Sequence, residues 1–113
     1  MLKALIVAAS ISATAIYGLA HTDPIGAVLS NPTHWDGRHV KVSGTISGLK
    51  ERTAVDGRTY DVFSLCDGGC VRVFMDGRPP ITEGRNLTVE GIFSAAKRIG
   101  DIEFQNDIQA DSD

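Results

Sequence analysis

Hydrophobic and polar residues alternate along the chain from residue 39 onward, which is the period expected of half-buried strands. Five such segments are predicted as strands, at residues 39–48, 59–66, 70–75, 86–94 and 100–110. Turn-forming pairs such as Asp56-Gly57 and Asp76-Gly77 separate them. Five short strands in so small a chain must close on themselves or leave exposed edges. The pattern therefore predicts an all-β fold, a small five-stranded barrel.

A short helix is predicted before the first strand. Asp23 offers a capping carboxylate and Pro24 suits the first helical position. Asn31-Pro32 ends the helix, and Trp35 is expected to pack it against one end of the barrel. The helix presents one apolar face, made of Ile25, Val28 and Leu29.

Residues 1–20 are typical of a signal peptide. Lys3 provides the positive start, an apolar stretch follows, and Gly18 and Ala20 suit a cleavage site before His21. We therefore expect a single domain at residues 21–113, periplasmic or secreted, with no stable membrane span after cleavage. An uncleaved membrane anchor is the alternative, although the apolar stretch is marginal in length and interrupted by Ser and Thr.

The central hairpin allows a prediction of register. If Asp67-Gly68-Gly69 is the loop, Cys66 faces Cys70, whereas a shift by one residue would turn an apolar set toward water. The interior side chains are then Phe63, Leu65, Val71, Val73 and Met75.

Cys66 and Cys70, opposite each other in an oxidising compartment, are predicted to form a disulfide. A pair of free thiols that binds a soft metal ion or has a redox role is the alternative. The three histidines, His21, His34 and His39, are not at a ligand spacing relative to one another. We assign no metal site and no cofactor.

Several segments resemble small exported bacterial OB-fold proteins, and more widely the OB domains that bind tRNA anticodons and single strands. They are Ser30-Asn31-Pro32 and residues 36–46, 60–65 and 83–91. The resemblance implies an OB-fold-like Greek-key barrel with a short N-terminal helix, and it carries no catalytic residue. OB-folds often place a helix between the third and fourth strands, but residues 76–85 are too few and too proline-rich for one.

Candidate ligand-binding residues follow from that fold, whose second and third strands and flanking loops bind ligands. The outward face of the hairpin carries Tyr60, Val62, Arg72 and Phe74, although a helix or loop that covers Val62 and Phe74 is the alternative. Basic residues are expected in the first and fourth loops, and we include them as candidates: Lys50, Arg52, Lys97 and Arg98.

The charge balance weighs against a partner held mainly through phosphates. The chain has 11 basic and 14 acidic residues, a net charge of -3. No catalytic motif or converging catalytic set is found, so we expect no enzyme. The leading hypothesis is an exported, non-catalytic binding module for a protein partner or an oligomeric ligand. The alternatives are single-stranded nucleic-acid binding and a periplasmic metal-binding or redox role for the CxxxC pair.

Overall fold

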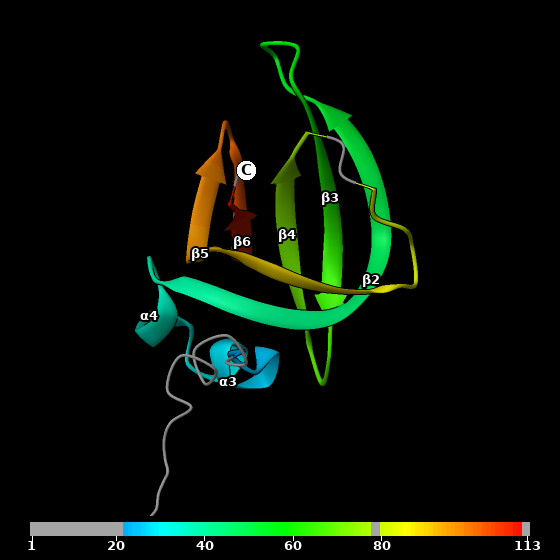
Figure 1. Ribbon diagram of the computed structural model, residues 1–113. Helices are drawn as coiled ribbons and strands as arrows, with labels where there is room; N and C mark the ends of the chain where they lie inside the picture. Colours follow the sequence, from blue (N-terminus) through cyan, green and yellow to red (C-terminus); the bar gives the residue numbers. More distant parts are fainter. Residues whose placement is uncertain (1–21, 78–79, 112–113) are drawn as a thin grey trace, which may run out of the picture.

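The computed structural model describes residues 22–77 and 80–111 (Figure 1). The predicted signal peptide, residues 1–20, and His21 lie outside the described residues. Among the described residues, no helix is long and apolar enough to cross a membrane.

The described chain forms a closed barrel of five strands with two short helices at one end (Figure 1). The strand order around the barrel is β2-β3-β4-β6-β5. The β4–β6 pair is parallel and the other four pairs are antiparallel. The predicted small all-β barrel is therefore confirmed. The elements are α3 (Ile25–Ser30), α4 (Pro32–Trp35), β2 (His39–Thr53), β3 (Thr59–Cys66), β4 (Cys70–Asp76), β5 (Asn86–Ile99) and β6 (Ile102–Ala110).

Two strands are longer than the sequence pattern predicted, because each changes partner along its length. The first half of β2 pairs with β5, and its second half continues past residue 48 to pair with β3 as far as Thr53. In the same way β5 continues past residue 94 to Ile99, where it pairs with β6. The added residues are mostly exposed on both faces, so their sequence lacks the alternation that marks a half-buried strand.

Glycines allow close backbone contact at the two places where the strands change partner. A Cβ at Gly44 would lie 2.7 Å from the Cys66 carbonyl oxygen. A Cβ at Gly91 would overlap the carbonyl oxygen of Gln109 on β6. Only a residue without a side chain lets these backbones approach so closely. Both closures of the barrel therefore depend on glycine.

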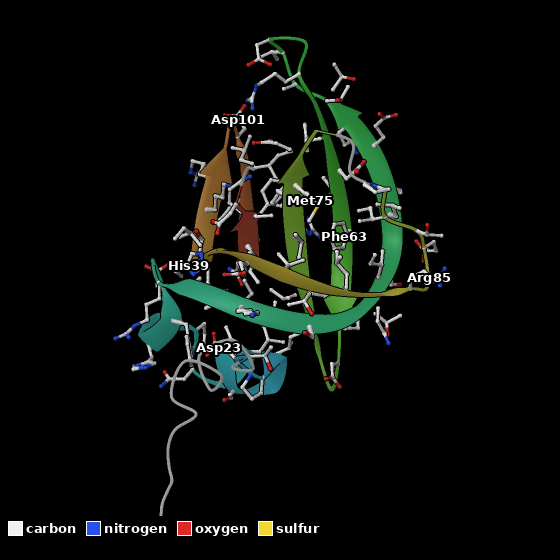
Figure 2. All side chains as sticks on the ribbon, in the orientation of Figure 1. Asp23, His39, Phe63, Met75, Arg85 and Asp101 are labelled. Atoms are coloured by element: carbon white, nitrogen blue, oxygen red, sulfur yellow. A yellow bond between two sulfur atoms is a disulfide. The ribbon has the colours of Figure 1, made fainter. Side chains whose placement is uncertain are left out.

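The β3–β4 hairpin has the predicted register, from Cys66 opposite Cys70 to Tyr60 opposite Asp76. Its inward side chains are in the core as predicted, except that Met75 is half-buried (Figure 2). The fully buried members are Phe63, Leu65, Val71 and Val73.

Helix α3 covers the end of the barrel beside the β3–β4 turn (Figure 1). On its predicted apolar face Ile25 and Val28 are buried and Leu29 is half-buried, and Trp35 packs against the core. The described part of residues 76–85 contains no helix. The end of the barrel beside the β3–β4 turn is covered instead by α3, which precedes the first strand in the chain.

The predicted capping role of Asp23 is wrong. Pro24 is the N-cap residue of α3, and no side chain caps the helix. The Asp23 carboxylate instead accepts a hydrogen bond of 3.0 Å from the Lys41 backbone N–H. Its own N–H donates to the Lys41 carbonyl at 2.6 Å. The two bonds hold Asp23 against β2, and its carboxylate is directed at the Lys41 amide and not at the helix.

Replacing Gly91 by Ala is expected to destabilise the fold by about 3 kcal/mol or more, because the new methyl group meets backbone that cannot rotate away. Urea unfolding measures the loss. Gly26→Ala is the matched control, since a Cβ at this helical position has no neighbour within 4 Å. That variant should be slightly more stable than the parent. Equal stability of the two variants would contradict the account of barrel closure.

Candidate functional site

The outward side of the β3–β4 hairpin has the composition predicted, but its side chains differ in exposure. Arg72 is exposed, whereas Tyr60 and Val62 are half-buried. Phe74 retains only 7% of its surface exposed, so the expectation that its ring is displayed is wrong. The ring is covered, as the alternative states, but by side chains of neighbouring strands and not by a helix or loop.

Neighbouring side chains from three strands cover Phe74. The Phe104 ring on β6 packs edge-on against it, with centroids 5.5 Å apart, and the Tyr60 ring lies 6.3 Å away. The Lys97 ammonium on β5 sits 4.9 Å from the Phe74 centroid. The Arg72 guanidinium lies 5.2 Å from the Phe104 centroid. Cations held over ring faces in this way are attracted by the π electrons.

Phe104 was not among the predicted site residues. Simple alternation along β6 places it on the same side as Ile108, which is in the core. Asn106, between them, has a positive φ of 57°, and this left-handed residue breaks the alternation. Phe104 consequently lies against Phe74 and Arg72 on the outside. Asn is among the few residues that adopt such a φ, which is the one sequence signal for the break.

Lys50 and Arg52 lie on the extended part of β2, not in the predicted loop. Together with Arg72 they line a groove of about 220 Å³ over the outer side of β3, whose floor includes Val62 and Ser64. The structure therefore brings these three predicted cations together, although they come from two strands that do not pair with each other.

Lys97 and Arg98 also lie on a strand, because β5 runs through them to Ile99. Lys97 joins the cluster over Phe74, and its ammonium donates to the Gln109 side-chain oxygen at 3.4 Å. Arg98 is opposite Glu103 in the β5–β6 ladder. It directly follows Lys97, and because successive strand residues point to opposite faces, Arg98 points away from the face that Lys97 joins. Arg98 is thus the one predicted cation that lies apart from the others. The other predicted candidates, together with Val62 and Phe104, form a surface that we name the basic–aromatic face. Its members are Lys50, Arg52, Tyr60, Val62, Arg72, Phe74, Lys97 and Phe104.

A buried carboxylate lies beneath this face. Asp107 is fully buried, and within the described residues neither of its carboxylate oxygens has a hydrogen-bond partner. It stands beside Arg72 in the β4–β6 register. Burial raises the pKa of Asp107, and the charges of Lys97 and Arg72 act in the opposite direction. The sequence contained no signal for this residue.

Cys66 and Cys70 form a disulfide at the tip of the β3–β4 hairpin, as predicted, with Cα atoms 4.1 Å apart. The closed loop is short, so the chain-entropy model gives a contribution of about 2 kcal/mol. A disulfide leaves neither sulfur available as a thiolate ligand for a metal ion.

No protein-family model matches this sequence, and no curated protein is found to be similar to it. One solved structure is similar in fold: a Klebsiella pneumoniae lipoprotein that is provisionally described as nucleic acid-binding. The similarity has a TM-score of 0.58 at 14% sequence identity and covers 88% of this chain and 95% of the other. At this identity the likeness shows a shared fold and nothing more.

Asp107→Asn is expected to stabilise the protein at neutral pH, by about 1 kcal/mol, because it removes a buried and unbonded charge. Because the pKa of Asp107 is raised in the folded state, its ionised carboxylate lowers the stability of the fold. This loss of stability grows as the pH rises through that pKa. The advantage of the variant should therefore shrink as the pH is lowered and Asp107 becomes protonated. Melting curves recorded from acid to neutral pH measure it.

Asp101→Asn is the matched control, since it removes the same charge at the exposed tip of the β5–β6 hairpin (Figure 2). It should leave the melting temperature nearly unchanged at every pH. If Asp107→Asn also leaves the melting temperature unchanged, or destabilises the protein at neutral pH, then the ionised Asp107 carboxylate does not destabilise the fold.

Proposed function

We propose that this protein is a non-catalytic binding module of the OB type that holds an extended single-stranded nucleic acid on its basic–aromatic face. The observation that carries the proposal is a set of four cations, two of them over the aromatic rings and two in the adjoining groove that Arg72 also lines. They are Lys50, Arg52, Arg72 and Lys97. Cations that follow the backbone and aromatic groups that contact bases are the means by which proteins hold single strands.

The strand order supports the OB assignment. The barrel runs β2-β3-β4-β6-β5, so the last two strands exchange their sequence order around the ring, and β4 pairs in parallel with β6. An OB-fold is a five-stranded Greek-key barrel that binds oligomers across its second and third strands, which here are β3 and β4. The proposed face lies over these strands and includes residues of β2, β6 and β5.

The net negative charge of the chain does not exclude this ligand, because the local potential of a face steers binding. Two of the acidic side chains outside the face are engaged by other groups. Asp56 pairs with Arg58, and Glu83 accepts hydrogen bonds from two backbone amides, which lowers the pKa of its carboxyl. Asp107, whose carboxylate is influenced by the charges of Lys97 and Arg72, is fully buried. The face therefore presents more positive charge than the composition of the chain suggests.

Export is part of the proposal. The leader-like residues 1–20 support it, and the structural neighbour from Klebsiella pneumoniae is a lipoprotein whose provisional description includes nucleic-acid binding. The disulfide suits an oxidising compartment.

An acidic protein segment is the second candidate ligand. The observation that favours it is the burial of Phe74, which leaves only the half-buried rings of Tyr60 and Phe104 for bases to stack on. An acidic peptide needs the cations but not the open ring faces.

The test is fluorescence anisotropy with a labelled, unstructured oligonucleotide over a range of salt concentrations. We expect binding at low salt that weakens as salt rises, with Lys50→Ala/Arg52→Ala lowering the affinity by about tenfold or more. Each lost phosphate contact should reduce the salt slope by about 0.7. Phe74 is left intact because its ring is buried and supports the fold.

The control is Arg38→Ala/Arg85→Ala, which removes the same formal charge from exposed positions outside the face. Figure 2 shows Arg85 on the opposite side of the barrel from the β5–β6 hairpin. The control should bind almost as well as the parent. Absence of binding at low salt, or an equal loss in both variants, would overturn the nucleic-acid assignment. Binding of a labelled polyglutamate peptide in its place would support the acidic protein segment.

A further inference from the structure

A second cluster of polar side chains lies at the end of the barrel where β2 begins. His39, Glu90 and Asp111 are all exposed, and each offers one ligand atom within 4.8 Å of the other two. The His39 Nε2 and Asp111 Oδ2 atoms are 2.7 Å apart. The three residues come from β2, β5 and the chain just after β6, and no ligand spacing in the sequence groups them.

The barrel closure builds this cluster. In the β2–β5 ladder, Lys41 is opposite Glu90 and His39 is opposite Ile92, so Glu90 and His39 are diagonal neighbours on the outer surface. Asp111 arrives from β6, which crosses β5 at close range at Gly91. The Asp111 N–H then donates to the Glu90 carbonyl at 2.8 Å. Contacts between backbones thus bring Asp111 close to His39 and Glu90.

The donor set indicates the class of ligand. One imidazole nitrogen with two carboxylate oxygens suits Zn²⁺ and similar first-row cations, whereas Mg²⁺ and Ca²⁺ prefer oxygen alone. Ligand atoms about 2.0–2.2 Å from one ion lie up to about 4 Å apart, so exposed side chains need only a small rotation to converge on it. Two carboxylates also match the charge of a divalent ion. Asp23 lies nearby as a further acidic group, and Lys41 is the adjacent cation.

We propose that His39, Glu90 and Asp111 form a binding site for a divalent transition-metal ion of the Zn²⁺ class, which we name the barrel-end site. The ion would replace the His39–Asp111 hydrogen bond and join the end of β6 to the start of β2. Three protein ligands leave a fourth position for water or another ligand, since Zn²⁺ sites are usually four-coordinate. The proposal is independent of the nucleic-acid function, because it uses none of the residues of the basic–aromatic face.

The test is calorimetric titration of the metal-free protein with Zn²⁺. All proteins carry His21→Ala, because a processed chain would begin with a histidine that can itself chelate metal. We expect one Zn²⁺ per chain and a higher melting temperature on binding. His39→Gln and Asp111→Asn should each weaken binding by about tenfold or more. His34→Gln, another exposed histidine, is the matched control and should bind like the parent.

A second readout uses the parent protein and does not depend on how the variants fold. Co²⁺ bound at the site should produce visible absorption, and Zn²⁺ should displace it. Absence of Zn²⁺ binding up to about 1 mM, where affinity becomes negligible, would overturn the proposal. So would unchanged binding in His39→Gln and Asp111→Asn, or an equal loss in His34→Gln. In those cases His39 and Asp111 form a surface ion pair and nothing more.

Discussion

The close approach of backbones at Gly44 and Gly91 is the constraint on which the rest of this structure depends. Each glycine stands where a strand passes from one partner to the next, and a Cβ at either position would meet a backbone carbonyl oxygen. Without these contacts β2 could not reach both β3 and β5, and β5 could not reach both β2 and β6. Two residues that have no side chain thus allow five strands to form one closed ring.

Closure has chemical consequences because it joins residues that are distant in the chain. The parallel β4–β6 pair places Arg72 beside Asp107 and brings Phe104 against Phe74. At the other end, the crossing of β5 and β6 brings Asp111 to His39. The two proposed sites are built in the same way, from side chains on strands that become neighbours only in the closed ring.

At the basic–aromatic face, the stability of the fold conflicts with the binding that we propose. A buried carboxylate without a hydrogen bond is costly, yet Asp107 lies under two cations that could attract an anionic ligand. The cations are not in hydrogen-bond contact with it, so they remain directed at the aromatic rings and at solvent. Such an arrangement weakens the fold locally while it leaves Arg72 and Lys97 available at the surface.

By itself, the sequence determined the features that depend on near neighbours. The register of the β3–β4 hairpin, the buried side chains on its inner face and the Cys66–Cys70 disulfide all follow from one short loop and a period of two. The tertiary structure alone decided the length of β2 and β5, the covering of Phe74 and the engagement of Asp23 with Lys41. Each of these depends on a strand or helix distant in sequence. Alternation shows that a residue faces outward, but it cannot show which other strand lies there.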